Sequence, residues 1–368
     1  MTEEAGSLGL LELNRTLLER QSLLRGSRLG GPESLVSRMC GLNAQYASSA
    51  FLSAWVRTSD FSEEAFRRSI LNGGMVRASL MRGTLHIVAK EDYLEWRPLM
   101  QPVLRRVVNS FFPGLLNRLS LERLAHEVKE ILMNGPLTRA EMGRRLTHRF
   151  SGEPPEALAF AARLLLPLIQ VPSPERWAYP NQPRYAWIEI PKESDTDKTL
   201  TSLFLSYLKA FGPASLADFQ AWSGLTYTAK LRDIASSLNL LTYRDQSGQT
   251  LFDTRDSKIV DADTPAPVRL LPDYDNILFA HRSRDRVIDP SIRPHVIRGT
   301  PRMPGTILIG GFVEGVWRAI DEGEGAPRLR IQLFKHNDPT PELREEAGRL
   351  AHYMFKSEKA EVKYATVV

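Results

Sequence analysis

The sequence predicts an α+β protein with three tandem winged helix-turn-helix units followed by a C-terminal β-rich segment. Two observations predict the repeated units. A short motif recurs along the chain, and each copy lies between helical patterns and a strand-turn-strand pattern. A third observation separates the C-terminal segment: after Pro265, short apolar runs alternate with Pro, Gly and Asp.

The recurring motif is clearest in GPLTRAEM (135–142) and GPASLADF (212–219). A Gly-Pro pair ends the preceding helix in each copy. Thr138 and Ser215 are expected N-caps, and the acidic residue three positions later is expected to reach back to the cap. GPESLVSR (31–38) is a weaker copy, because it lacks the alanine and the acidic residue.

Apolar residues at helical spacing predict helices before and after each copy of the motif. The expected helices cover 10–24, 44–57, 120–133, 156–169, 199–211 and 226–238. Hairpins, or wings, are expected at 75–89, 176–190 and 240–254, each containing a polar turn. Helix, capped helix, helix and hairpin together form the winged-helix plan.

These patterns divide the chain into four predicted domains. Winged helices cover 9–98, 118–191 and 198–260, and an α+β domain covers 265–368. In the last domain, apolar runs predict strands. One amphipathic helix then begins at Pro341, with Thr340 as its expected cap.

Positive charge is concentrated in the first part of the chain. Residues 1–150 contain 21 Lys and Arg against 15 Asp and Glu, whereas 151–368 contain 27 against 28. All but Lys90 and Lys129 of the early basic residues are arginine, which suits bidentate phosphate contacts. Together with the winged-helix plan, this predicts contact with DNA or RNA; an ordinary solvated basic face is the alternative.

The second unit holds the densest basic group of the sequence. The group lies on or beside the capped helix and consists of Arg139, Arg144, Arg145, His148 and Arg149. The last three would share one helix face. We interpret the group as DNA phosphate contacts, with an exposed face of no binding role as the alternative. The following helix, ALAFAARLLLPLI, is almost entirely apolar and is expected to be core rather than a base-reading helix.

Several classes of site are disfavoured by the sequence. The chain has one cysteine, Cys40, and seven scattered histidines, so neither a disulfide framework nor a metal site is expected. It lacks HExxH, CxxC, GxSxG, Walker A and GxGxxG motifs. No apolar run approaches the ~18 residues of a membrane span, and the acidic N-terminus does not resemble a secretory signal. We therefore expect a cytoplasmic protein.

Two polar clusters remain as candidate functional residues. Asn43 and Gln45 flank Ala44 between the second and third helices of the first unit; taken alone, such a pair is typical of helix capping. Arg82, Thr84 and His86 are expected to alternate on one face of a strand. That face either lines the DNA groove beside Asn43 or is an ordinary hydrogen-bonded strand face.

Four runs give the chain a resemblance to a known family. They are LNRTLLERQ, RASLMRGTLHIVA, LLPDYDNILFAHRSR and GGFVEGVWR, spread over roughly residues 9–335. Together they resemble the AlkZ-like and YcaQ-like winged-helix DNA glycosylases. The resemblance implies a monofunctional DNA glycosylase for bulky N7-alkylguanine adducts, with interstrand crosslinks among the substrates of some members. Some members protect antibiotic-producing bacteria from their own product.

The resemblance also assigns roles to residues. The family's catalytic motif is Gln-apolar-Gln or Gln-apolar-Asp, and the matching triplet here is Asn43-Ala44-Gln45. The first glutamine is replaced by asparagine, which is one methylene shorter, so this chain departs from the family pattern at Asn43. Asn276, Arg282 and Arg284 fall in a family-like run, beside Asp275, and are expected to support the site or the DNA. The implied protein is a nucleoid-associated bacterial monomer that acts on double-stranded DNA with alkylated guanine.

The chemistry is consistent with amides alone. Guanine alkylated at N7 already carries positive charge, so it leaves the sugar as a neutral molecule and needs no strong acid. An amide carbonyl is able to orient water and favour positive charge at C1′. Hydrolysis of this bond needs no cofactor. No lysine lies near the motif in the sequence, so we expect no lyase step.

Two other classes of function compete with this one. A winged-helix transcriptional regulator would need a polar recognition helix, for which the third unit offers only Lys230 and Arg232, and would usually bind as a dimer. A winged-helix scaffold for protein partners fits the apolar second-unit helix but leaves the arginine surplus unexplained.

Overall fold

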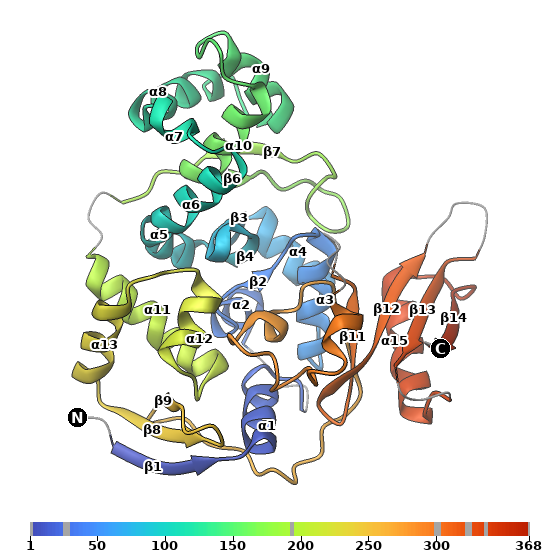
Figure 1. The fold of residues 1–368 in the computed structure, drawn as a ribbon. Helices are drawn as coiled ribbons and strands as arrows, with labels where there is room; N and C mark the ends of the chain where they lie inside the picture. Colours follow the sequence, from blue (N-terminus) through green and yellow to red (C-terminus); the bar gives the residue numbers. More distant parts are fainter. Residues whose placement is uncertain are drawn as a thin grey trace.

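The structure, a computed structural model, describes residues 3–24, 30–191, 195–297, 303–320, 326–334 and 338–366. It confirms the α+β class, since helices are combined with three separate sheets. Figure 1 shows the second unit (teal to green) at one end of the molecule and the C-terminal sheet (orange to red) at another. None of the described helices has the length and apolar character needed to span a bilayer.

The first unit contains four helices and a hairpin. Its elements are α1 (Leu10–Arg20), α2 (Pro32–Arg38), β2 (Leu42–Asn43), α3 (Ala47–Arg57), α4 (Glu63–Leu71), β3 (Met75–Ser79), the 3-10 turn η1 (Met81–Gly83) and β4 (Leu85–Ala89). The weaker Gly-Pro copy behaves as its sequence suggests: Gly31 precedes α2 without any side-chain cap. The expected alternation of Arg82, Thr84 and His86 on one strand is wrong, because only His86 lies in β4.

Three helices that the periodicity argument did not predict connect the first two units: α5 (Lys90–Leu99), α6 (Gln101–Phe111) and α7 (Leu115–Arg118). Pro98 lies inside α5, and Pro102 lies at the first turn of α6. Prolines usually mark helix ends, which explains why local signals do not reveal this segment.

The second unit contains α8 (Leu121–Leu132), β5 (Leu137–Thr138), α9 (Arg139–Thr147), α10 (Pro155–Leu165), β6 (Leu168–Gln170) and β7 (Arg184–Trp187). The predicted wing at 176–190 is wrong in its first strand, which lies at 168–170 instead. Because Pro167 disfavours helical backbone at Leu166, α10 ends at Leu165 and the chain becomes extended. Most side chains of α10 are buried, which confirms the prediction that this apolar helix belongs to the core.

The third unit contains α11 (Thr196–Phe211), α12 (Leu216–Ser223), α13 (Thr228–Ser237), β8 (Leu240–Asp245) and β9 (Thr250–Thr254). The two predicted capping boxes are confirmed. Thr138 caps α9 with Glu141 reaching back, and Ser215 caps α12 with Asp218 reaching back.

The wings of the first two units form one sheet. Its strand order is β2-β4-β3-β6-β7-β5, and the two wings meet at the Arg77–Gln170 pair. In the third unit, the corresponding edge of β8 is covered by the parallel N-terminal strand β1 (Glu3–Leu8), which the sequence patterns did not predict. Fusion of the wings therefore places β2, and Asn43 on it, in a sheet shared by two units.

The C-terminal segment combines a five-stranded sheet with short helices and one long helix. Its elements are β10 (Arg269–Leu271), the 3-10 turn η2 (Asn276–Phe279), α14 (Arg293–Val296), β11 (Gly305–Ile309), β12 (Phe312–Ile320), β13 (Arg328–Leu333), α15 (Pro341–Phe355) and β14 (Glu361–Thr366). Thr340 caps α15, and Pro341 lies in its first turn, as predicted.

One hydrophobic cluster runs through all three units. It includes Leu17 of α1, Leu124 of α8, Leu208 of α11 and Leu278 of η2, each fully or almost fully buried. The three units and the start of the C-terminal segment therefore share a core, and elements far apart in sequence meet around β2 (Figure 1).

Candidate active site

The Asn43-Ala44-Gln45 triplet lies where α2 turns into β2 and then into α3. Cys40 and Gly41 both have left-handed backbone conformations, with φ of 53° and 82°, so the chain reverses sharply before the triplet. A Cβ on Gly41 would lie 2.6 Å from Val88 Cγ1, so glycine is required there. The Ala44 N–H then donates to the Leu85 carbonyl at 2.8 Å, which fixes the triplet against β4.

The two amides of the triplet differ in their surroundings. Asn43 is 7% exposed and is paired with His86 across β2 and β4. Gln45 is half-buried, and its side-chain amide makes no hydrogen bond with any residue that the structure describes. Gln45 is thus the amide that is available to bind water or substrate.

Arg77 holds the main chain of the triplet. Its Nε and Nη2 atoms donate to the Ala44 carbonyl at 2.9 and 2.7 Å, and Nη2 also donates to the Gln45 carbonyl at 3.0 Å. Its Nη1 atom donates to Oε1 of Gln170 in the second unit at 2.7 Å. Burial lowers the pKa of Arg77, yet its fork of donors remains bonded to acceptors. The second unit therefore contributes to the position of the triplet.

Arg82 connects Asn43 to the third unit. Its guanidinium donates to the carbonyl of Trp222 at the end of α12 and lies 3.4 Å from the Asn43 side-chain oxygen. The α-carbon of Arg82 also approaches Gly224, where a Cβ would meet it at 3.3 Å. Burial, with the nearby Arg284, lowers the pKa of Arg82 to about 10, so the group stays cationic at neutral pH.

Asn276 fixes the start of the triplet from the C-terminal segment. Its Oδ1 accepts from the Asn43 main-chain N–H at 2.9 Å, and its Nδ2 donates to the Gly41 carbonyl at 2.6 Å. The neighbouring Asp275 forms a fully buried, bidentate ion pair with Arg57 of α3, with N–O distances of 2.7 and 2.8 Å. Asn276 is 5% exposed, which favours support of the site over a DNA contact among its two expected roles.

His86 is likewise not a surface group. It is 2% exposed, and its Nδ1 donates to the Thr84 carbonyl at 3.0 Å. Burial, followed by the charge of Arg82, lowers its pKa to about 3, so it is neutral at physiological pH. This burial favours the second interpretation of His86, as part of an ordinary hydrogen-bonded strand face. Thr84 is half-buried, and its hydroxyl donates to the Met81 carbonyl.

Cationic and aromatic side chains lie together beside the triplet. Arg82 and Arg284 both pack over the Phe279 ring, at 5.6 and 5.2 Å from its centroid. Phe279 stacks with Tyr274. The ring centroid of Tyr274 is 6.4 Å from that of Tyr46, the residue that follows Gln45. Tyr46 is 41% exposed, so this edge of the site presents an aromatic face as well as positive charge.

The remaining predicted DNA contacts lie further from the triplet along the chain. Arg139, Arg144, Arg145, His148 and Arg149 of the second unit are all exposed, as is Arg282 of the C-terminal segment. Arg149 is ion-paired with Glu127, and Arg145 donates to the Ile131 carbonyl at 3.2 Å. The side chains of Arg139, Arg144, His148 and Arg282 make no hydrogen bond with the described residues.

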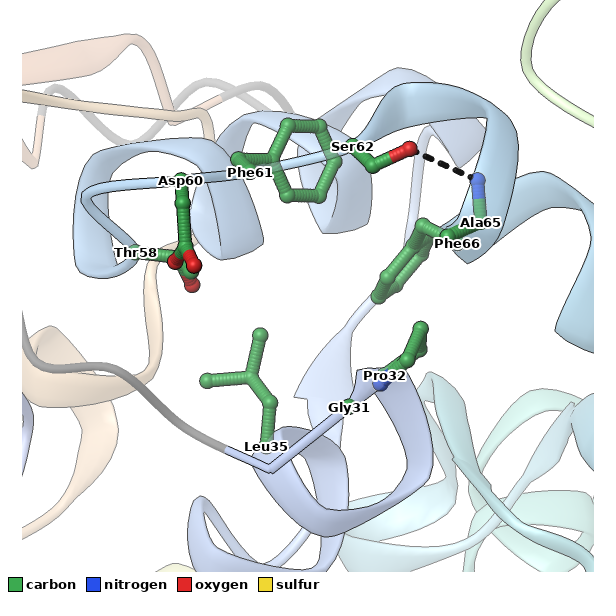
Figure 2. Close-up of a pocket in the computed structure, with 9 residues that line it drawn as sticks. All are labelled: Gly31, Pro32, Leu35, Thr58, Asp60, Phe61, Ser62, Ala65 and Phe66. Carbon is green, nitrogen blue, oxygen red and sulfur yellow. Dashed lines mark hydrogen bonds between the residues drawn. The ribbon is translucent and has the colours of Figure 1, made fainter.

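A separate cavity of about 230 Å³ lies on the first unit. Figure 2 shows the side chains of Leu35, Phe66 and Asp60 around it, with Ser62 capping α4 through the Ala65 N–H. Its lining includes neither amide of the triplet, and it is mainly apolar. In the described part of the chain, no three His, Cys, Asp or Glu residues are grouped as metal ligands.

Sequence reasoning missed Arg77 and Gln170 as positioning residues and Tyr46 as an exposed aromatic neighbour. Arg77 opens the family-like run RASLMRGTLHIVA, and Tyr46 directly follows the triplet, so proximity to a motif was the available signal. No local signal marks Gln170, because its contact with Arg77 spans 93 positions.

Similarity to known proteins identifies the family of the chain. The sequence model of the DNA glycosylase AlkZ-like family matches residues 36–353. The chain is 27% identical over 343 residues to the interstrand DNA cross-link repair glycosylase of Streptomyces sahachiroi, covering 86% of this chain and 89% of that protein. The solved structure of Streptomyces sahachiroi DNA glycosylase AlkZ superposes with a TM-score of 0.77 at 22% identity, covering 98% of this chain and 100% of that one. The chain therefore belongs to the AlkZ-like family of DNA glycosylases.

Proposed function

We propose that this DNA glycosylase hydrolyses the N-glycosidic bond of bulky N7-alkylguanine adducts, including interstrand crosslinks. Its role would be DNA repair or self-resistance to a genotoxic natural product. The curated relative from Streptomyces sahachiroi is named for crosslink repair, which supports crosslinks as a substrate class. The observation that carries the proposal is the free amide of Gln45 beside a rigidly held Asn43.

In the proposed mechanism, Gln45 orients the attacking water. Its amide is not engaged by other described side chains, whereas the Asn43 side-chain oxygen lies next to Arg82. Asn43 therefore assists by shaping the site rather than by activating the water. Neither amide titrates, and the neutral His86 behind them adds no acid at neutral pH. Such a site suits a base that already leaves as a neutral molecule, and suits unmodified guanine poorly.

A test uses a duplex with one bulky N7-guanine adduct, followed by alkali to cut at abasic sites. We expect Gln45→Ala to lower the single-turnover rate by about 10²–10³-fold, as for loss of one preorganised polar group. Asn43→Ala should lower the rate less, and Asn43→Gln should retain activity. Gln332→Ala in β13 is the matched control for loss of a glutamine amide elsewhere.

Two outcomes would overturn the proposal. One is release of normal guanine as readily as the N7-alkylated base. The other is full activity of Gln45→Ala. A duplex with an interstrand crosslink, assayed in parallel, separates crosslink unhooking from excision of single-strand adducts.

The structure does not favour a transcriptional regulator. The helix α10, at the recognition position of the second unit, is buried along most of its length. In the third unit, Lys230 is ion-paired with Asp197. The helix α10 therefore lacks the exposed polar face that base reading requires, and the ion pair engages Lys230, one of the two basic residues that α13 offers.

A further inference from the structure

We propose that the cavity between the first and second units binds one phosphate group of the damaged DNA strand, next to the lesion. The inference rests on the proposed function and deepens it, because it adds a fixed strand contact beside the catalytic triplet. The cavity has a volume of about 300 Å³. Its walls come from β3 and β4 of the first unit and from β5, α9, α10, β6, β7 and the residues just before β7 in the second.

The lining of this cavity is selective for an anion. Three guanidinium groups, those of Arg77, Arg139 and Arg163, line it together with the polar side chains of Gln170, Gln182 and Tyr185. No Asp or Glu lies among its lining residues. Arginine forks match the geometry of phosphate oxygens, which makes a phosphate the best fit among biological anions.

The arginines of the cavity repel one another in the free protein. Burial lowers the pKa of Arg163, and the charge of Arg139 lowers it further. Burial also lowers the pKa of Arg77, with a further contribution from Arg163. The Nε atom of Arg163 is buried and has no hydrogen-bond partner within the described ranges. A bound anion would relieve the repulsion and supply the missing acceptor.

The cavity shares a wall with the active site. Arg77 lines the cavity and also holds the Ala44 and Gln45 carbonyls, and Leu85 lines it while accepting from the Ala44 N–H. A phosphate in the cavity is thus separated from the catalytic triplet by a single side chain. This arrangement places the contact on the strand that carries the lesion.

The rim of the cavity explains why a strand, and not a small enclosed anion, is the expected occupant. Arg139 and Gln182 at the rim are exposed, so the cavity opens to the surface. A phosphodiester needs such an opening, because its chain continues in both directions. A narrow closed pocket would instead favour a free ion.

The test uses adducted duplexes in which each phosphate near the lesion is replaced in turn by a neutral methylphosphonate. For the wild type, we expect one position on the damaged strand to weaken binding by roughly tenfold, the loss of a charge-assisted contact. In Arg163→Gln and Arg139→Gln, the same substitution should cause no further loss. Arg328→Gln, on β13 far from α9 in Figure 1, is the control and should keep the wild-type response.

A flat methylphosphonate profile in the wild type would overturn the proposal, as would an undiminished response in both arginine variants. Dissociation constants are measured before base release, so the result holds even if the adduct is not excised. Excision without a sensitive phosphate would refute the cavity alone, and absence of excision from every adduct would refute the proposed function alone.

A second readout covers the case in which Arg163→Gln fails to fold. Arg139 is exposed, so Arg139→Gln should fold normally. On undamaged duplex, its plot of log binding constant against log salt should be less steep by about 0.9, the value for one lost phosphate contact. An unchanged slope would count against a phosphate contact at Arg139.

Discussion

The turns that follow the second helix in the first and second units occupy the same place in the repeat but are held differently. In the first unit, residues 39–46 are fixed by Arg77, Arg82 and Asn276, which bring in partners from every other part of the chain. In the second unit, residues 148–154 are held by exposed ion pairs, Arg149 with Glu127 and Arg118 with Glu153.

This difference suits the catalytic role that we propose for the first turn. Surface ion pairs in water contribute little and allow movement, whereas buried guanidinium groups bonded to several acceptors favour one geometry. A catalytic amide gains from a fixed position, because misplacement by about 1 Å costs about 10²-fold in rate. The turn of the second unit has no such requirement and remains a surface feature.

The largest expected effect comes from breaking the buried ion pair behind the first turn. Asp275→Ala leaves Arg57 buried without its partner, and we expect the free energy of unfolding to fall by about 3–5 kcal/mol. Glu127→Ala, which frees Arg149 at the second turn, should cost no more than about 1 kcal/mol. Urea unfolding of both variants measures the contrast. Equal losses would show that the two turns are held alike.

The next effect concerns rate rather than stability. Arg77→Lys keeps the charge but cannot bond the Ala44 and Gln45 carbonyls together with Gln170, so kcat should fall by about 10²-fold with a smaller change in KM. Arg118→Lys at the second turn should leave kcat unchanged. Single-turnover excision assays distinguish these results; a wild-type rate for Arg77→Lys would remove Arg77 from its positioning role.

A smaller effect depends on pH. His86 has a folded-state pKa of about 3, below its ordinary value of 6.5. Between these values the unfolded chain binds more protons, so stability falls as the pH is lowered through 6.5. The loss between pH 7 and pH 5 should be about 2 kcal/mol from this histidine. His86→Asn, which keeps a donor for the Thr84 carbonyl, should flatten this part of the profile, as followed by urea unfolding at each pH.

A histidine at the second turn provides the control for this pH profile. There, His148→Asn removes an exposed imidazole and is the matched control for His86→Asn. If His86→Asn leaves the acid-induced loss intact, the burial of a neutral His86 is not its source.

The smallest expected effect is on DNA affinity at the second unit. The Arg144 side chain has no hydrogen-bond partner in the described structure, so Arg144→Gln should weaken binding a few-fold and reduce the salt slope by about 0.9. Arg149→Gln should change the slope less, since Glu127 already neutralises Arg149. Titration of a fluorescent duplex at several salt concentrations measures both. A larger slope change for Arg149 than for Arg144 would contradict this assignment.

By itself, the sequence determined the local plan of the protein. Capping boxes at Thr138 and Ser215, the weak cap at Gly31 and the helix start at Pro341 follow from rules that act within about four residues. The resemblance to a family also located the Asn43 and Gln45 amides. Local rules failed at Pro98, which lies inside a helix, and at the wing of the second unit.

Only the tertiary structure decided how the amides are held and which polar residues face solvent. Arg82 meets the Trp222 carbonyl across 140 positions, and Asn276 meets the Asn43 N–H across 233. Periodicity left open whether His86 lines the DNA groove or lies on an ordinary hydrogen-bonded strand face, and the sheet shared by two wings buries it. The physical reason is that a buried polar group needs its partners at hydrogen-bond distance, and the fold supplies them from segments that no local pattern connects.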